Sequence, residues 1–395
     1  MTKPLPRHSL TCCAPLAGAF LSTTFALLAG ALLAGCRGRP AAGETWSPTV
    51  AGVTAPERAK IEPLRAHVNL TSHIVNYPPQ KWAHVDLCTD LQAPADDRAS
   101  YRTALARYER LNPRARIGTY LSGRDTCPPE SQKYEPANTV PHAALGAADY
   151  RGPAREYRGR FTVALEKPAT RAKFAELIAA EAVRRGRPIL MLDNLAHPSA
   201  MGDWIPWSDT LDLLRRIKTG IGGIQLIANV GGAPGLMPRP DYEALADVVD
   251  GMILEQPLHE RLRSSRGGVE AVIALYRHWL ARGRIVILLP VISEVSRPDE
   301  SKEAAGQRIK AERQRESAFV AAFCLIVRDR TDRPLYTTAP FWEEPPAWER
   351  WPAALGPARG DFRWEGDALV REFERGVVKA TPKTGEGRVE LRSGP

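Results

Sequence analysis

The chain has 395 residues, 44% of them hydrophobic, and a formal net charge of +9 at pH 7. This apolar content is enough to bury a sizeable core, which excludes a globally disordered chain. The basic residues are spread along the sequence and form no arm with interleaved aromatics, which excludes nucleic-acid binding as the main function. A length of this order accommodates one large α/β domain with appendages.

The N-terminal residues resemble a bacterial lipoprotein signal peptide. Lys3 and Arg7 precede an uncharged, apolar segment that ends in the sequence LAGC at Cys36. An aliphatic residue, two small residues and a cysteine form the lipobox pattern, in which the cysteine thiol receives the lipid. We therefore expect a signal peptide over residues 1–35 and lipidation of Cys36. The alternative is an uncleaved transmembrane anchor, because the apolar segment is long enough to span a bilayer.

Both interpretations place the folded part in the cell envelope, at the outer membrane, in the periplasm or on the extracellular face. Arg37 follows the cysteine where an Asp would indicate inner-membrane retention, which favours the outer membrane. Residues 36–62 are rich in Ala, Pro, Gly and Thr and predict a flexible tether between the lipid and the folded domain. The lipid is thus the expected contact with the membrane.

The number and positions of the cysteines are compatible with an exported protein. Cys12 and Cys13 leave with the signal peptide, and Cys88, Cys127 and Cys324 remain. A disulfide between Cys88 and Cys127, which lie near the ends of two predicted strands, is compatible with an oxidising compartment. Cys324 lies in an apolar run and is expected to be a buried thiol. The chain contains no Cys-x-x-Cys and no His-Glu-x-x-His, so we expect neither a metal nor a cofactor.

Short apolar runs alternate with helical patterns through the middle of the chain. The runs predict strands at residues 66–70, 84–88, 116–121, 188–193, 223–229, 251–255, 284–290 and 335–338. The 3.6-residue periodicity predicts helices at residues 99–111, 170–185, 210–219, 241–249, 269–282 and 300–327. Near-continuous apolar strands alternating with helices predict the α/β class, with a (β/α)8 TIM-type barrel over residues 63–345. An open, doubly wound sheet is the alternative.

Two further segments differ from this alternation. Residues 122–157 show no regular pattern, and long loops of this kind usually carry function or cover a site. Residues 346–395 predict a small β appendage, with strands at 369–373 and 377–381 forming a hairpin. Gly376 is expected to supply a positive φ to the hairpin turn. Residues 383–395 are expected to be a loose tail.

Two of the predicted strands run directly into an acidic residue. Residues 189–192 lead into Asp193, and residues 252–254 lead into Glu255. The active site of such a barrel lies at the carboxyl ends of its strands. Glycoside hydrolysis needs two carboxyl groups on either side of one bond. We therefore predict Asp193 and Glu255 as the catalytic pair, with Glu255 as proton donor and Asp193 as nucleophile or base.

Several segments resemble the glycoside hydrolase barrels related to bacterial endo-α-1,4-polygalactosaminidases. The resemblance covers about residues 80–382 and is carried by RIGTYLSGRD at 116–125, PILMLDNL at 188–195, GIQLIANVG at 223–231, GMILEQP at 251–257 and REFERGVVKATP at 371–382. In that group the acid after the fourth strand and a later strand-end Glu are the presumed catalytic residues. The resemblance therefore implies the same pair, Asp193 and Glu255.

Other residues near strand ends are candidates for substrate binding: Tyr120, Asp125, Asn194, Asn229, Glu294 and Trp342. Asn229 either bonds a sugar hydroxyl or caps a loop. Asp125 either lines a subsite or belongs to a salt-bridged loop, and the same alternative holds for Tyr120. Glu294 is the main rival for an acid role. Trp342 either stacks on a pyranose face or packs in the interior.

Two classes of function follow from these predictions. The first is a surface-tethered glycoside hydrolase that acts on an extracellular polysaccharide, an amino-sugar polymer being one candidate. The second is a non-catalytic barrel that keeps a carbohydrate-binding groove. A metal-assisted deacetylase or an esterase lacks support, because the chain contains no Gly-x-Ser-x-Gly elbow and no His-rich ligand set.

Overall fold

The computed structural model describes residues 65–70, 85–90, 99–113, 115–126, 140, 144–153, 160–195, 205–230, 239–255, 265–289, 300–328, 335–338 and 351–392. All of these residues belong to one unit, Val50–Pro395. No helix within these ranges combines the length and the apolarity needed to cross a membrane.

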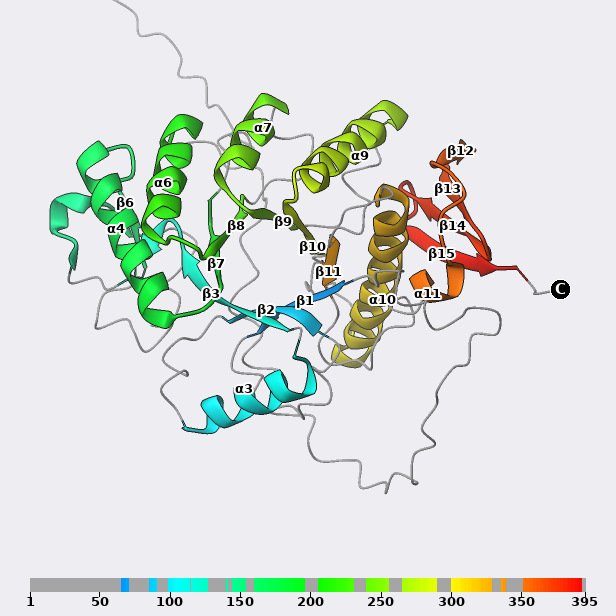
Figure 1. Ribbon diagram of the computed structural model, residues 1–395, viewed down its shortest axis with the longest axis horizontal. Helices are drawn as coiled ribbons and strands as arrows, with labels where there is room; N and C mark the ends of the chain where they lie inside the picture. The colour runs from blue at the N-terminus through cyan, green and yellow to red at the C-terminus, as the bar shows by residue number, and fades with distance from the viewer. Residues whose placement is uncertain are drawn as a thin grey trace, which may run out of the picture. The chain divides into compact units, whose positions relative to one another are not determined.

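Eight parallel strands form a closed barrel (Figure 1), in which β1 is hydrogen-bonded to both β11 and β2. Around the barrel the order is β1-β11-β10-β9-β8-β7-β3-β2. The strands are β1 (Arg65–Leu70), β2 (Val85–Asp90), β3 (Arg116–Ser122), β7 (Ile189–Asp193), β8 (Gln225–Asn229), β9 (Gly251–Glu255), β10 (Ile285–Leu289) and β11 (Leu335–Thr338). Each falls on a predicted apolar run. The predicted α/β class and TIM-type barrel are confirmed, and the open, doubly wound alternative is wrong.

Large apolar side chains fill the barrel interior. The interior cluster consists of Leu87, Tyr120, Ile189, Met191, Ile227, Ile253, Ile285 and Ile287. A glycine at position 251 makes room for it, because a Cβ there would lie 2.8 Å from the Cβ of Ile285. Asp193, Asn229 and Glu255 each follow a member of this cluster by two residues. Because side chains alternate along a strand with a period of two, Asp193 and Asn229 continue the interior-facing row at the carboxyl end of the barrel.

The outward-facing strand residues pack against the helices in a second, larger core cluster. Its strand members include Leu190, Leu192, Leu226, Met252 and Leu288, and its helix members include Phe174, Ile178, Leu214, Tyr242 and Phe323. The helices are α3 (Ala99–Leu111), α4 (Pro168–Arg185), α6 (Trp207–Gly220), α7 (Arg239–Val248), α9 (Arg266–Ala281), α10 (Lys302–Val327) and α11 (Trp351–Leu355). All six predicted helices are confirmed, and the short α11 was not predicted.

The ends of these helices have local causes in the sequence. Ser265 caps α9, since its Oγ accepts a hydrogen bond from the backbone N–H of Gly268. Ser301 caps α10 in the same way. Helix α4 begins at Pro168 and ends at Arg185, and the next residue, Gly186, has a φ of +64°, in the left-handed region that favours glycine.

The segment after β3 contains regular structure that the sequence did not reveal. β4 (Asp125–Thr126), β6 (Phe161–Val163) and β5 (Tyr150–Pro153) form a three-stranded antiparallel sheet in that order. A 3-10 helix, η7 (Ala147–Asp149), precedes β5. The expectation of no regular element over 122–157 is therefore wrong. Strands of two to four residues are too short for a periodic pattern to show.

The C-terminal residues form a four-stranded antiparallel sheet, β12 (Arg363–Glu365), β13 (Ala368–Phe373), β14 (Gly376–Thr381) and β15 (Glu386–Leu391). The predicted hairpin is confirmed as β13 and β14. The expectation of a loose tail over 383–395 is wrong, because β15 pairs with β14 along its whole length.

The role predicted for Gly376 is also wrong. The positive φ angles of this sheet occur at Gly366 and Gly385, in the turns on either side of the hairpin. Gly376 is needed for another reason, since a Cβ there would lie 2.6 Å from the carbonyl oxygen of Glu390 and 2.8 Å from Leu355. The role of this glycine is thus to let β14 pack closely against Glu390 and Leu355, and not to adopt a turn conformation.

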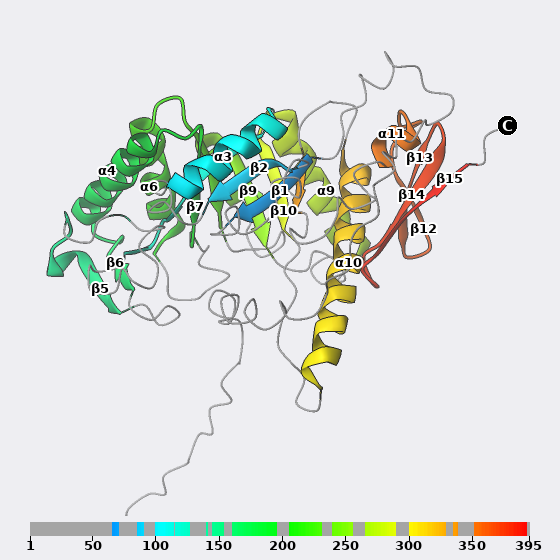
Figure 2. The same ribbon diagram turned by 90° about the horizontal axis from the view of Figure 1, so that it is seen from below.

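Helix α10 lies between the barrel strands and the C-terminal sheet in both views (Figures 1 and 2), and it contacts β11, β14 and β15. Gly387 of β15 permits this contact, because a Cβ there would lie 2.5 Å from the Cα of Phe319. The sheet is therefore packed directly on a helix of the barrel.

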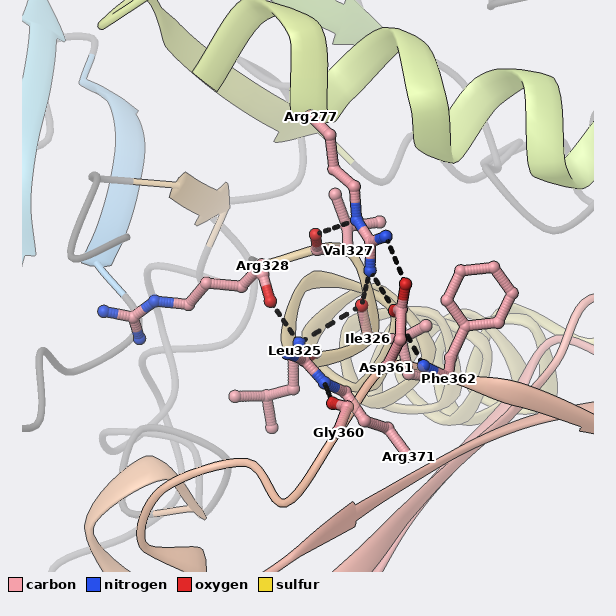
Figure 3. Close-up of polar contacts among 9 residues, drawn as sticks. All are labelled: Arg277, Leu325, Ile326, Val327, Arg328, Gly360, Asp361, Phe362 and Arg371. Carbon is pink, nitrogen blue, oxygen red and sulfur yellow. Dashed lines mark hydrogen bonds and ion pairs between the residues drawn. The ribbon is translucent and has the colours of Figure 1, made fainter. Parts of the chain in front are cut away.

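Two arginines bind the carboxyl end of α10 (Figure 3). The Nη1 of Arg371, a buried residue of β13, donates to the carbonyl oxygens of Leu325 at 2.8 Å, Ile326 at 3.3 Å and Arg328. Arg277 of α9 donates to the carbonyl of Val327 at 3.0 Å and, at 2.8 and 2.5 Å, to the carboxylate of Asp361. The last carbonyls of a helix have no partner within it, so these arginines satisfy them and join three elements.

Candidate active site

Asp193 is the last residue of β7 and lies at the carboxyl end of the barrel. The hydroxyl of Tyr120, on β3, donates a hydrogen bond to its Oδ2. The side-chain amide of Asn229, on β8, donates to its Oδ1 at 2.7 Å. Strands β3 and β8 lie on either side of β7. The structure thus brings three predicted site residues together, with one donor on each carboxylate oxygen.

The backbone turns sharply after Asp193. Asn194 has a φ of +61° and is the one residue other than glycine with a positive φ in the described part of the chain. Asn tolerates this left-handed conformation better than most residues. The N–H of Gly123 donates to the carbonyl of Asp193 at 2.8 Å, and the N–H of Leu195 donates to the carbonyl of Asn229 at 3.1 Å. These bonds hold the strand end on both sides.

Ser122 links this turn to the segment that follows β3. Its buried hydroxyl accepts hydrogen bonds from the backbone N–H of Asp125 at 3.1 Å and from the side-chain amide of Asn194 at 3.3 Å. The sequence reasoning missed Ser122. The signal that could have found it is a serine at a strand end, where its hydroxyl commonly bonds the next turn. Asn194 was predicted to bind substrate, and its amide donates to this serine.

Glu255 is the last residue of β9, and it pairs with Leu289 of β10. In the ladder between β8 and β9, Asn229 is opposite Ile253. Glu255 therefore lies two residues closer to the carboxyl end of β9 than the residue opposite Asn229. One strand, β8, separates it from Asp193. The side chain of Glu255 lies outside the described part of the structure.

Asp125 is fully buried and does not line an open subsite. Its Oδ2 lies 2.9 Å from the Nε of Arg124, which is also buried, and its Oδ1 accepts a hydrogen bond from Thr162 at 3.2 Å. Burial raises the pKa of Asp125, while the guanidinium groups of Arg124 and Arg160 oppose this rise. The salt bridge of the alternative stated above is therefore present, but Asp125 lies in the short strand β4 and not in a loop.

Other predicted residues lie outside the described ranges: Cys36, Cys127, Glu294 and Trp342, together with the side chain of Cys88. Cys324 is a buried free thiol, as predicted. In the ranges that are described, no three His, Cys, Asp or Glu side chains are grouped so that they could hold a metal ion.

No family model and no curated protein matches the chain. Similar solved structures include Ega3 from Aspergillus fumigatus in complex with galactosamine, at 8% identity and TM-score 0.41 over 70% of this chain and 90% of that one. Another is a GH27 β-L-arabinopyranosidase from Geobacillus stearothermophilus, at 10% identity and TM-score 0.48 over 82% and 85%. A third is the glycoside hydrolase domain of PelA from Pseudomonas aeruginosa, at 15% identity and TM-score 0.38 over 70% and 95%. The barrel is shown by the strand order of the chain itself.

Proposed function

We propose that the protein is a glycoside hydrolase that cleaves an extracellular polysaccharide with Asp193 and Glu255. The observation that carries this proposal is the carboxylate of Asp193 at the carboxyl end of a closed barrel, bonded on one oxygen by Tyr120 and on the other by Asn229. A carboxylate held in this way has the fixed position that a reacting group needs.

The strand order supports a suitable distance between the two acids. Strands β7 and β9 are separated only by β8, so their backbones lie roughly 10 Å apart at about 4.8 Å per strand. Interior-facing side chains of a barrel converge toward its axis. We therefore expect the carboxyl groups of Asp193 and Glu255 within the range of about 5–9.5 Å that glycosidases use.

The hydrogen bonds favour one division of roles. Both oxygens of Asp193 accept hydrogen bonds, and the amide of Asn229 can only donate at that contact. This arrangement suits an ionised carboxylate, which acts as nucleophile or base. Glu255 is then the proton donor.

In this mechanism Glu255 gives its proton to the glycosidic oxygen while the bond from that oxygen to the anomeric carbon breaks. Asp193 either forms a bond to the anomeric carbon or takes a proton from the water that attacks it. In the first case, the carboxylate of Glu255 next takes a proton from water, and the resulting hydroxide releases the sugar from Asp193.

The sequence pattern at the N-terminus supports a lipid anchor at Cys36 and a position in the cell envelope. In a bacterial host that expresses the full-length sequence, we expect metabolic labelling with radioactive palmitate to mark the processed protein that begins at Cys36. The variant Cys36→Ala should lose the label and keep the longer, uncleaved N-terminus, because no thiol is left to receive the lipid. Equal labelling of this variant would contradict the anchor.

The test of the hydrolase proposal is a screen of the full-length protein, in mild detergent, against neutral, anionic and amino-sugar polysaccharides. The family resemblance makes α-1,4-linked galactosamine polymers the first choice. We expect new reducing ends from at least one polymer class. The double variant Asp193→Asn/Glu255→Gln, purified in parallel, is the blank. Binding without reducing ends would instead support the non-catalytic barrel.

A further inference from the structure

Tyr120 and Asn229 are both directed at Asp193, although the sequence suggested that they bind substrate. Each occupies a different oxygen of the same carboxylate, and each comes from a different neighbouring strand. We propose, on the basis of the function given above, that Tyr120 and Asn229 are positioning residues that hold Asp193 for catalysis and do not bind the sugar.

Their burial argues against contact with a polysaccharide. Asn229 is 1% exposed and Tyr120 is 7% exposed. Tyr120 also belongs to the interior cluster together with Ile189 and Met191. A polymer that lies across the barrel mouth meets exposed groups, whereas these two side chains are almost wholly buried.

Their location on strands argues for a positioning role. Tyr120 pairs with Met191 in the ladder between β3 and β7, and Ala228, the residue before Asn229, pairs with Leu192 between β7 and β8. Both β3 and β8 are therefore hydrogen-bonded to β7, the strand that ends in Asp193. Groups mounted on paired strands move little, so two bonds from opposite sides fix the carboxylate against rotation.

Among the described residues, these two side chains make the only hydrogen bonds to the carboxylate of Asp193. Only one of them, the phenol of Tyr120, is titratable. The amide of Asn229 is neutral and donates, so aspartate at this position would set a second negative charge against Asp193 with almost no change of shape.

The kinetic test uses Tyr120→Phe, Asn229→Ser and Asn229→Asp on a polymer that the wild type cleaves. We expect kcat to fall about 10- to 100-fold in each variant with KM within about twofold, because the interaction acts on the reacting group. Asn229→Asp should lose the most activity, owing to the like charges. Higher KM with unchanged kcat would overturn the proposal in favour of direct sugar binding.

A matched control is Tyr242→Phe. Its hydroxyl is buried in α7 and has no hydrogen-bond partner among the described residues. This variant removes a phenolic hydroxyl, as Tyr120→Phe does, but from a tyrosine that does not bond to Asp193. We therefore expect unchanged kcat and KM. An equal loss of kcat in this control would assign the effect of Tyr120→Phe to packing.

Crystal structures of the wild type and the three site variants test the same proposal without turnover. We expect the Asp193 carboxylate to rotate away from its wild-type orientation in each folded variant. An unmoved carboxylate in Tyr120→Phe and both Asn229 variants overturns the positioning role. A wild type that cleaves no polymer contradicts the hydrolase function, and this comparison still decides whether the two residues hold Asp193.

Discussion

Asp193→Asn is expected to lower the rate of polysaccharide cleavage by about 1,000-fold or more, equivalent to roughly 4 kcal/mol of transition-state stabilisation. The amide has the shape of the carboxylate but can neither attack the anomeric carbon nor take a proton from water. The hydroxyl of Tyr120 can rotate to accept a hydrogen bond from the new amide, so the fold should be preserved. Initial rates of reducing-end release measure the effect.

The matched control is Asp367→Asn, the same change at an exposed residue that pairs with Lys383 in the C-terminal sheet. We expect its rate to remain within about twofold of the wild type, since surface charges far from the reacting group contribute little. A rate for Asp193→Asn above one-tenth of the wild-type rate would show that another group performs the chemistry.

Asp125→Ala is expected to lower the free energy of unfolding by about 3–5 kcal/mol. The side chains of Arg124 and Asp125 are 3% and 0% exposed, and they lie 2.9 Å apart. Removing the carboxylate leaves a buried guanidinium without this partner, which is among the most destabilising changes in a protein interior. Urea denaturation followed by circular dichroism measures the loss.

The double variant Arg124→Met/Asp125→Leu is expected to recover most of this stability. Burial raises the pKa of Asp125 against the opposing effect of Arg124, which indicates that desolvation outweighs the attraction within the pair. Replacing both charges with apolar side chains removes this cost, and the larger volume of Leu relative to Asp offsets part of the gain. A double variant less stable than Asp125→Ala would contradict this account.

The exposed pair of Arg151 and Glu166, with side chains 34% and 38% exposed, provides the matched comparison near the same small sheet. Glu166→Ala is expected to change the free energy of unfolding by less than about 1 kcal/mol, because solvent screens the pair. Equal losses at Asp125 and Glu166 would show that burial of the first pair has no energetic consequence.

The sequence by itself determined the elements of the barrel. Strands β7 to β10 are apolar along most of their length because both of their faces are buried, and such runs are visible in the sequence alone. The positions of Asp193 and Glu255 at the ends of their strands followed from the same runs. Periodicity is a local property of a helix or strand, so it can be read without knowledge of the fold.

Only the tertiary structure decided which residues surround Asp193. Tyr120 and Asn229 are 73 and 36 residues away from it along the chain. They meet its two oxygens because closure of the barrel places β3 and β8 on either side of β7. The burial of Asp125 likewise depends on a sheet of very short strands, and the ordering of β15 depends on its packing against α10. Strand order and register are set by contacts between distant segments, and no local pattern carries that information.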